Sequence, residues 1–385
     1  MINIVDKKKC CGCTACEAAC HKKCIRMITD NEGFIYPEVD KKICVDCKIC
    51  ENVCPIINPP KVSSEINSYV VRDKRKNVVK QSTSGGVFTS MMEYVLKNNG
   101  IIYGVIADEK QIVRHIRIES ADDDRIKKIP GSKYVRSDIT GIYKQIKIDA
   151  EAGKLICFSG TPCQVAGLKN YLHKDYSNVI LVDVVCRGNP SPLFWKKFVE
   201  YLESKYNSKI TNVQFRSKTY GYHSGSMRVD FENGKKYVAS VNANIFLKAF
   251  FKDLCSRPSC YDCAFKSEKR CSDLTLYDCW HAGELLRIKD DDKGYTNVIV
   301  HSKAGKDFLK NISEYLEIFE VDTEKAIKLD GIMVHNSVPW NEKREHFLDG
   351  LSETGDLENY CLRFFSINLK DKFIESMKKY VYFFK

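Results

Sequence analysis

Cysteines are the residues whose type and spacing point most directly to chemistry. The chain has 385 residues and 19 cysteines, ten of which lie between Cys10 and Cys54. Two runs in this segment, residues 10–20 and 44–54, repeat the spacing C-x2-C-x2-C-x3-C. In bacterial-type ferredoxins this spacing binds [4Fe–4S] clusters, and the fourth cysteine of each run ligates the other cluster. The repeat therefore predicts two such clusters rather than a zinc site or a disulfide framework.

The repeat also assigns ligands to each cluster. The first cluster is expected to be held by Cys10, Cys13, Cys16 and Cys54. The second is expected to be held by Cys44, Cys47, Cys50 and Cys20. Cys11 and Cys24 fall outside the spacing, and we expect them to be small buried residues. Because a two-cluster module moves electrons one at a time, the rest of the chain must provide the electron donor, the acceptor or both.

A second cysteine-rich segment spans residues 255–279 and contains the pair Cys260 and Cys263. Three arrangements are compatible with its spacing. A local zinc or plant-type [2Fe–2S] site would use Cys255, Cys260, Cys263 and Cys271. A third [4Fe–4S] cluster would instead use Cys163, Cys186, Cys260 and Cys263. The third interpretation is that all of these cysteines are reduced, buried thiols.

The elements that must position these residues follow an α/β pattern beyond a linker at residues 58–64. Strands are predicted over 154–158 and 179–185, and cysteine-bearing loops follow both. The carboxyl ends of neighbouring parallel strands meet at one sheet edge, so Cys163 and Cys186 are expected to lie together. Further strands are predicted over 68–72, 101–107, 112–118, 213–216, 226–231, 236–240 and 297–301, and helices over 85–97, 140–150, 162–172, 192–205 and 305–315.

A glycine-containing segment, Ser82–Val87, precedes one of the predicted helices. Serine and threonine are favoured at helix N-caps, and the free N–H groups there attract anions. The segment matches neither a Walker loop nor G-x-G-x-x-G. By its pattern alone it is either a phosphate-binding loop or an ordinary helix cap.

Composition excludes several classes of protein. The net charge is +11, but the Lys and Arg residues are scattered, with no run longer than Lys7–Lys9, so we expect no nucleic-acid binding. No apolar run approaches the ~18 residues that a membrane-spanning helix needs, and the N-terminal residues lack the apolar stretch of a signal peptide. We therefore expect a cytoplasmic protein, in which clustered cysteines bind metal rather than form disulfides.

Taken in order, these motifs resemble the coenzyme F420 hydrogenase/dehydrogenase beta-subunit family, in its bacterial form with a fused N-terminal ferredoxin domain. The resemblance runs from Cys10 to about Phe347. It is carried by the ferredoxin repeat and by STSGGVFTSMMEYVL, GSKYVRSD, FSGTPCQVAGLK, VDVVCRGNPSP, RPSCYDCAFK and SDLTLYDCW.

The resemblance implies a flavoprotein that binds FAD beside a [4Fe–4S] cluster. It favours a third cluster held by Cys163, Cys186, Cys260 and Cys263. It also implies flavin-binding residues, which are Ser82, Thr83, Ser84, Gly85, Gly86, Val87, Thr161, Pro162 and Gln164. Lys133 is a candidate for phosphate or substrate binding, and we assign no catalytic acid or base.

The expected fold is a ferredoxin-type domain fused to a mixed α/β flavin-binding domain. The expected regions are 1–60 (ferredoxin-type), 65–150 (N-terminal α/β region), 151–347 (flavin and third cluster) and 348–385 (helical tail). The implied function is an iron–sulfur flavoprotein oxidoreductase that exchanges electrons between ferredoxin or another redox protein and a small organic substrate, with F420 as one candidate. The alternative is a non-catalytic electron-transfer subunit that feeds a partner enzyme.

One segment departs from the family pattern. Tyr277 and Cys279 stand where family members usually have a glycine and an aromatic residue. If this segment is a loop that lines the substrate face, the substrate differs from F420.

Overall fold

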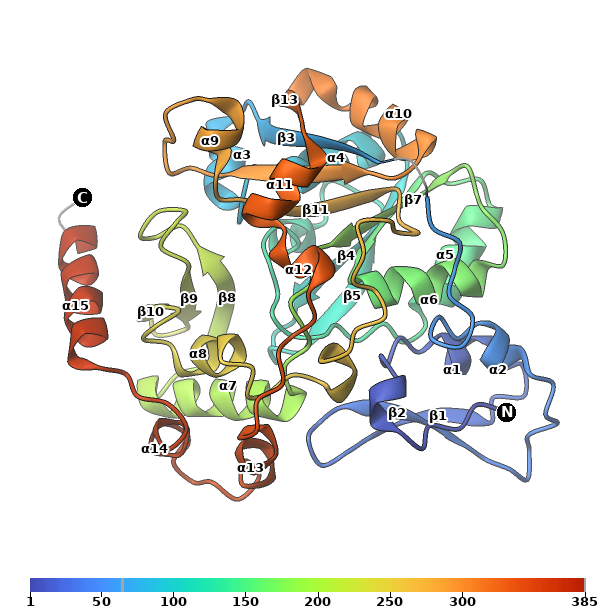
Figure 1. The fold of residues 1–385 in the computed structure, drawn as a ribbon, viewed down its shortest axis with the longest axis horizontal. Coiled ribbons are helices and arrows are strands. Elements are labelled where there is room, and N and C mark those ends of the chain that lie inside the picture. Colours follow the sequence, from blue (N-terminus) through green and yellow to red (C-terminus); the bar gives the residue numbers. More distant parts are fainter. Residues whose placement is uncertain (64–65, 384–385) are drawn as a thin grey trace.

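The computed structural model describes residues 1–63 and 66–383 of the chain. Three bodies are visible in Figure 1: an N-terminal cysteine-rich module, a large sheet with helices on both faces, and a small sheet with its own helices. The expected fold class, a ferredoxin-type module followed by a mixed α/β fold, is confirmed.

The N-terminal module consists of a hairpin and two short helices. The hairpin pairs β1 (Ile25–Thr29) with β2 (Ile35–Val39) in antiparallel register. Helices α1 (Ala15–Ala19) and α2 (Ile49–Asn52) each lie inside one cysteine run. Each begins after a residue with left-handed backbone, Thr14 (φ 67°) and Lys48 (φ 64°). The two cysteine runs thus fold into two similar loop–helix units. A short 3-10 helix spans Lys7–Lys9.

The large sheet has eight strands in the order β13-β3-β12-β11-β7-β6-β4-β5. Strands β4, β6, β7 and β11 run parallel to one another, and the other pairings are antiparallel. The bounds are β3 (Asn67–Asp73), β4 (Ile101–Ala107), β5 (Val113–Ile118), β6 (Ile156–Gly160), β7 (Val179–Val184), β11 (Leu274–Cys279), β12 (Tyr295–Val300) and β13 (Leu316–Val321). Residues 274–279 therefore form a central strand, which corrects the expectation of a loop there.

Helices cover both faces of this sheet. Helices α4 (Val87–Lys97) and α10 (Lys303–Asn311) pack into one apolar layer, and α5 (Ile142–Glu151) and α6 (Pro162–Leu172) pack into the layer on the other face. That second layer also contains Cys13, Ala15 and Val53 of the N-terminal module. The module is therefore docked onto α6 through a shared core. The remaining helices of this body are α3 (Lys76–Gln81), α9 (Ala282–Leu286), α11 (Thr323–Asp330), α12 (Ile332–His335) and 3-10 turns at Asp124–Lys128, Pro258–Cys260 and Ser313–Tyr315.

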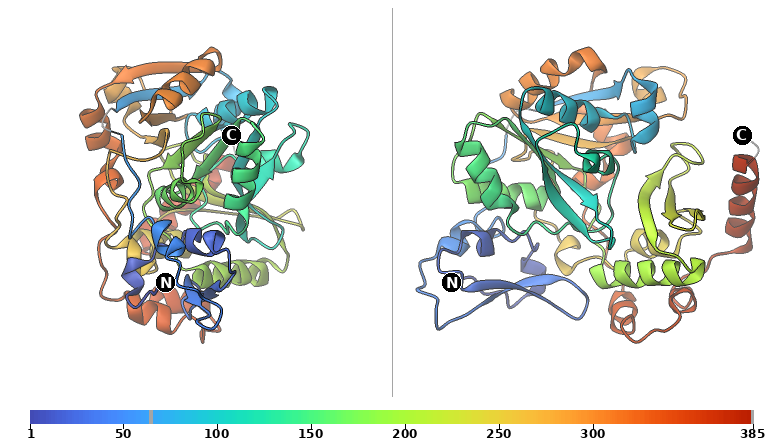
Figure 2. Two further views of the ribbon diagram at one scale, coloured as in Figure 1. Left: turned by 90° about the vertical axis from the view of Figure 1, so that its right-hand side faces the viewer. Right: turned by 180° about the vertical axis from the view of Figure 1, so that it is seen from behind.

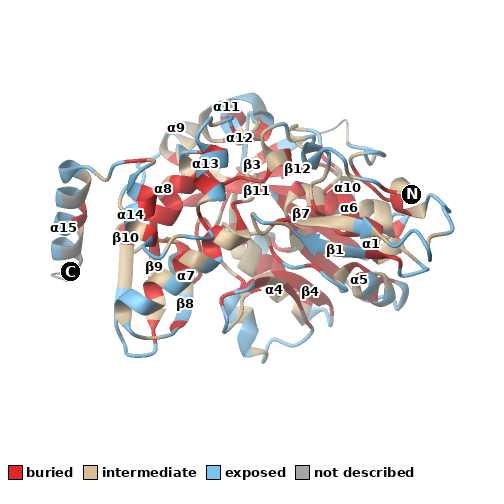
Figure 3. Ribbon diagram, turned by 90° about the horizontal axis from the view of Figure 1, so that it is seen from below, coloured by how far each residue is buried: buried red, intermediate tan, exposed pale blue. Residues whose placement is uncertain are grey.

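The small sheet has the order β10-β9-β8 and is entirely antiparallel. Aromatic residues such as Phe194, Trp195 and Phe246 fill its core, and α8 beside this sheet is coloured largely as buried in Figure 3. Helix α15 stands apart from the other helices (Figure 2), and Leu369 and Phe373 on it are 83% and 67% exposed. The elements are β8 (Ile210–Ser217), β9 (Ser226–Phe231), β10 (Lys236–Ser240), α7 (Pro192–Tyr206), α8 (Ile245–Phe251), α13 (Arg344–Asp349), α14 (Leu357–Leu362) and α15 (Leu369–Phe383). The last two residues of the expected helical tail lie outside the described residues.

None of the helices described in residues 1–63 and 66–383 is long and apolar enough to cross a membrane.

A buried ion pair docks the hairpin of the N-terminal module. Arg344 donates to both carboxylate oxygens of Glu32, at 3.0 and 2.5 Å, and its Nε donates to the Ser256 carbonyl at 2.8 Å. The two side chains are only 3% and 14% exposed. Ser191 Oγ donates to the Glu32 carbonyl at 2.5 Å. The hairpin turn is thereby held against the start of α7.

We predict that Arg344→Gln lowers the free energy of unfolding by about 3–5 kcal/mol, because it leaves the Glu32 carboxylate buried without its partner. Urea denaturation measures this loss. Lys127→Gln is the matched control, since the side chains of Lys127 and Asp124 are 78% and 90% exposed and the pair contributes less than ~1 kcal/mol. Equal losses in the two variants would contradict the docking role of Arg344.

Candidate functional site

The N-terminal module contains two cavities, and each is lined by four of the predicted ligand cysteines. The first cavity is lined by Cys10, Cys13, Cys16 and Cys54 together with apolar residues such as Ile2, Ile4 and Ile56. The second is lined by Cys20, Cys44, Cys47 and Cys50. The fourth cysteine of each run thus lies at the cavity of the other run, as the ferredoxin spacing predicts. We call these sets the first and second cysteine groups.

The chemistry of these cavities fits iron–sulfur clusters. Thiolates are soft ligands that suit iron–sulfur clusters, and an apolar lining limits solvent access. In the described part of the chain, no three Cys, His, Asp or Glu side chains converge as the ligands of one metal ion would. The two left-over cysteines also line these cavities, Cys11 the first and Cys24 the second. Cys24 Sγ lies 3.4 Å from Cys20 Sγ.

A third cysteine group gathers where strands of the large sheet end. Cys163 lies in the first turn of α6 after β6, and Cys186 follows β7. An antiparallel bridge between Pro190 and Ser256 joins the segment after Cys186 to the segment before Cys260. The Asn189 N–H donates to Cys260 Sγ at 3.4 Å. The carboxyl edge of the sheet therefore collects these loops, as the α/β pattern predicts.

The charges of these four thiols influence one another's pKa values. Burial raises the pKa of Cys186 to about 12, and the charges of Cys163 and Cys263 act in the same direction. Burial and the neighbouring Cys186 and Cys263 likewise raise the pKa of Cys260. Four thiols that disfavour one another's ionisation are stabilised as thiolates when a metal centre binds them. The charges of the third group, Cys163, Cys186, Cys260 and Cys263, therefore act on one another at this sheet edge, and their role as a ligand set stays a prediction.

The local arrangement considered for residues 255–271 is not formed. Cys255 lies fully buried in the aromatic core of the small sheet. Cys271 packs against the layer that contains α5 and α6. Burial raises the pKa of Cys271 to about 12, and the charge of Asp183 acts in the same direction. Only Cys260 and Cys263 of this segment join the third group.

The first and third groups approach each other through Cys11. This thiol interacts with Cys13 of the first group and with Cys163 of the third, and its interaction with Cys13 contributes most to a strongly raised pKa. Gly167 of α6 allows the approach, since a Cβ atom there would lie 3.0 Å from Cys13 Sγ. Spacing alone identified Cys11 as a packing residue. Gly167, which lies one helical turn after Cys163 and beside Cys13, is the sequence feature that could have indicated this approach.

The glycine segment connects α3 to α4 and lies beside β3, and its polar atoms form hydrogen bonds within the protein. Thr296 Oγ1 accepts from the Gly85 N–H at 2.9 Å and lies 2.8 Å from Ser84 Oγ. Ser82 Oγ donates to the Val78 carbonyl at 2.8 Å, and Gly86 has left-handed backbone (φ 87°). The Ser132 N–H donates to Thr83 Oγ1 at 3.0 Å. The segment is thus a rigid turn before Val87, the first residue of α4.

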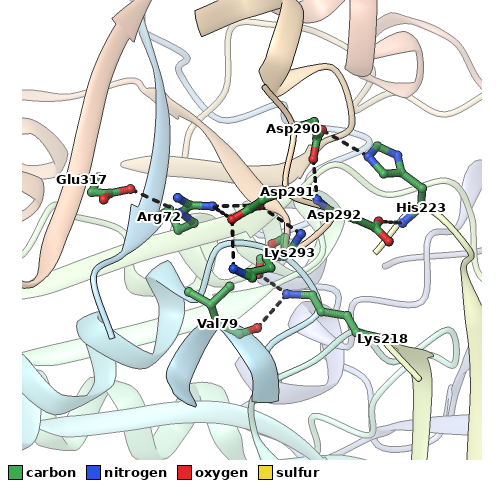
Figure 4. Close-up of polar contacts among 10 residues, drawn as sticks. Arg72, Val79, Lys218, His223, Asp290, Asp291, Asp292, Lys293 and Glu317 are labelled. Atoms are coloured by element: carbon green, nitrogen blue, oxygen red, sulfur yellow. Dashed lines mark hydrogen bonds and ion pairs between the residues drawn. The ribbon is translucent and has the colours of Figure 1, made fainter. Parts of the chain in front are cut away.

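Two partly buried lysines flank this segment without a carboxylate partner among the described residues. Lys218 donates to the carbonyls of Val79 and Ser84, both at 2.7 Å (Figure 4). Lys133 donates to the carbonyls of its own turn, including that of Ile129 at 2.6 Å. Burial lowers the pKa of Lys218 to about 8 and that of Lys133 to about 7. Ammonium groups that burial has destabilised fit a site for an anionic group such as a pyrophosphate.

The acidic loop between α9 and β12 contacts the segment between β8 and β9, close to Lys218 (Figure 4). Asp291 forms an ion pair with Arg72 of β3 at 3.0 Å, and Arg72 also pairs with Glu317. Asp292 accepts from the His223 N–H at 2.9 Å. This network fixes the segment that carries Lys218 against the glycine segment.

The residues around the start of α6 have a structural role. Gln164 Oε1 accepts from the Thr161 N–H at 3.1 Å, and its Nε2 donates to Ser137 Oγ at 3.0 Å. Pro162 is the first residue of the helix, a position that suits proline. Thr161 Oγ1 lies 3.2 Å from Cys163 Sγ. These residues therefore hold Cys163 in position, and any flavin contact by Thr161, Pro162 or Gln164 stays a prediction.

The two residues that depart from the family pattern are buried on β11. Tyr277 packs with Ile299 and Val334, and Cys279 packs with Val70 and Tyr295. Both residues contribute to apolar clusters rather than to an open face. The departure therefore carries no information about the substrate.

Comparison with known proteins finds that part of the chain is similar to a known family. Residues 153–325 match the family model that describes the C terminus of the coenzyme F420 hydrogenase/dehydrogenase beta subunit. This part of the chain is similar to that family. The match contains the whole third cysteine group, and the N-terminal module lies outside it. The beta-subunit match indicates a redox protein of the hydrogenase/dehydrogenase type.

Searches of curated proteins and of solved structures add little to the family match. No curated protein matches the chain. Among solved structures, a chain of the F420-reducing [NiFe] hydrogenase complex from Methanosarcina barkeri is similar, with 18% identity and a TM-score of 0.43. The similarity covers 71% of this chain and 89% of that chain, and at this TM-score nothing further follows from it.

We predict that Gly85→Ala destabilises the fold around the glycine segment by about 1–3 kcal/mol. A Cβ atom at Gly85 would lie 2.5 Å from the Val71 carbonyl oxygen, which belongs to β3 and cannot move freely. Thermal unfolding followed by circular dichroism measures the change. Gly355→Ala is the control, because a Cβ there meets nothing within 4 Å. A melting temperature of Gly85→Ala as high as that of Gly355→Ala would refute this packing.

Proposed function

We propose that this protein is an iron–sulfur flavoprotein oxidoreductase. It relays single electrons between a redox protein and FAD, and so reduces or oxidises a small organic substrate by two electrons. The observation that carries the proposal is the series of three cysteine groups that runs from the exposed second group to the sheet edge, with Cys11 between the first and third groups. The beta-subunit family match supports it.

The proposed roles of the protein's own residues follow from their chemistry. The thiolates of the three cysteine groups would each hold one [4Fe–4S] cluster. Such clusters carry one electron at a time, and FAD combines two electrons with a proton for hydride transfer. Ile2, Ile4 and Ile56 exclude water from the first group. Lys218 and Lys133 would bind the pyrophosphate of FAD beside the glycine segment.

The surface around the second group supports an acidic redox partner, with ferredoxin as the candidate. Cys47 is exposed, and so are Lys22, Lys23 and Lys42 nearby. Two apolar side chains, Ile43 and Val45, are 49% and 57% exposed. A basic rim around an apolar patch would attract an acidic carrier and bring its redox centre close to the second group.

The alternative function, an electron-transfer subunit without its own substrate, is favoured by one observation. Helix α15 exposes a stripe of apolar residues at helical spacing, which includes Leu369, Phe373 and Met377 at 83%, 67% and 49% exposure. Such a stripe suits docking to a partner enzyme. If the purified protein alone reduces or oxidises an organic acceptor such as F420, it is an enzyme with its own substrate and not only an electron-transfer subunit.

Substitution of one cysteine from each group tests the cluster proposal. We expect Cys16→Ser, Cys47→Ser and Cys163→Ser each to lower the iron content of anaerobically purified protein by about four atoms per chain, the content of one cubane. Cys271→Ser is the control and is expected to retain full iron. If Cys271→Ser loses iron while Cys163→Ser retains it, the third group is not a ligand set.

The pKa values of the two lysines predict the pH dependence of flavin binding. Lys133 and Lys218 lose their protons at about pH 7 and about pH 8, so the positive charge that attracts a pyrophosphate declines as the pH rises. We therefore expect the affinity for FAD to fall between pH 7 and pH 9. Lys218→Met should weaken binding at pH 7 and flatten the decline above it. Flavin fluorescence titration measures both.

Lys196→Gln is the control for this titration, because Lys196 is an exposed lysine of α7. It is expected to behave as the unchanged protein does. FAD affinity that is constant from pH 7 to pH 9 and unaffected by Lys218→Met would contradict a pyrophosphate site at this segment.

A further inference from the structure

Arg257 connects the third cysteine group to the first. Its backbone belongs to the loop of the third group: its N–H donates to the Asn189 carbonyl at 2.8 Å, and its carbonyl accepts from the Cys260 N–H at 2.9 Å. Its side chain reaches the N-terminal module, where Nε donates to the Cys10 carbonyl at 2.8 Å and Nη2 donates to the Ile35 carbonyl at 2.9 Å. One residue thus contacts the loops of both groups.

The guanidinium of Arg257 lies directly on the first cysteine loop. A Cβ atom on Gly12 would lie 3.1 Å from its Nη1, so the glycine permits this contact. The side chain is only 1% exposed, and its charge centre lies 4.2 Å from the centre of the Tyr36 ring. Nη1 has no hydrogen-bond partner in the described part of the chain. One N–H donor group of this guanidinium, Nη1, is therefore buried without a hydrogen bond.

The positive charge of Arg257 has no carboxylate partner within 4.0 Å among the described residues. The two acidic residues of the adjacent hairpin turn have other partners, since Asp30 pairs with Lys7 at 2.6 Å and Glu32 pairs with Arg344 at 2.5 Å. A second guanidinium acts on the same loop, because Arg136 donates to the Gly12 carbonyl. A buried cation without a partner is costly, and an anionic group beside it removes that cost.

The second cysteine loop has the opposite electrostatics. Asp46 occupies the position in the repeat that Gly12 occupies in the first run. It is exposed and pairs with the N-terminal ammonium of Met1 and with Lys48. The two loops share their spacing. Among the residues that the structure describes, the first loop is contacted by the buried guanidinium of Arg257 and the partly buried guanidinium of Arg136, and no arginine contact to the second loop is found.

We infer that Arg257 raises the reduction potential of the cluster held by the first group above that of the cluster held by the second group. Reduction adds one electron, and therefore one negative charge, to a cluster, and a nearby buried cation stabilises the added charge. Electrons that enter at the exposed second group would then move inward to the first group with a loss of free energy. This inference rests on the proposed clusters.

The test is a redox titration of the full-length holoprotein, followed by EPR. We expect Arg257→Gln to move the midpoint potential of one ferredoxin-type cluster to more negative values and to leave the other unchanged. The signal that disappears in Cys47→Ser identifies the second group, and the signal that disappears in Cys163→Ser identifies the third group. The shifted signal must be the one that both of these variants retain. Arg257→Lys retains the charge and is expected to shift the potential less than Arg257→Gln does.

Two further variants separate charge from architecture. Arg344→Gln removes another buried guanidinium from the same interface, away from the cysteine loop, and is expected to leave both potentials unchanged. Arg136→Gln removes the second cation at Gly12 and should shift the same signal as Arg257→Gln. The role of Arg257 would be overturned if neither Arg257→Gln nor Arg136→Gln changed a midpoint potential. It would also be overturned if Arg344→Gln shifted the potential as much as Arg257→Gln does. A protein that binds no iron would instead contradict the proposed function itself.

Discussion

Electrons pass efficiently only between centres that the protein holds close together, and this constraint makes the contact between the N-terminal module and the sheet edge decisive. The module shares an apolar layer with α5 and α6, and Gly167 lets α6 approach Cys13. The Glu32–Arg344 pair fixes the hairpin, and Arg257 fixes the first cysteine loop. Without this contact, the module would be a separate electron carrier on a linker, and the third group would have no neighbour.

The large sheet provides the other half of the contact with the N-terminal module. The parallel strands β6 and β7 end at the edge where Cys163 and Cys186 lie. Cys260 and Cys263, which follow the small sheet in sequence, lie at the same edge. The small sheet also places Lys218 on the glycine segment, 134 residues away in sequence. The proposed one-electron and two-electron sites are thus assembled from segments that the topology brings to one side of one sheet.

The features that sequence predicted are those set by local pattern. The cysteine spacing indicated which thiols gather in each cavity of the module, and the apolar, β-branched run at 179–184 indicated β7. Strands β11 and β13 were missed because their pairing with β12 and β3 is determined by distant segments. Cys11 and Arg257 were missed for a related reason: their significance depends on the docking of the module, which no local pattern encodes. By its sequence the glycine segment was equally compatible with a phosphate-binding loop and with an ordinary helix cap. The partly buried lysines beside it, Lys133 and Lys218, favour an anion site.

The most direct test of the account is the metal content and EPR spectrum of reduced, anaerobically purified full-length protein. The account predicts about twelve irons per chain, as three cubanes require, and EPR signals broadened by magnetic coupling between neighbouring clusters. Iron near eight atoms per chain, with zinc bound at the third group and uncoupled signals, would contradict it, because the sheet edge would then hold no redox centre for the module to contact.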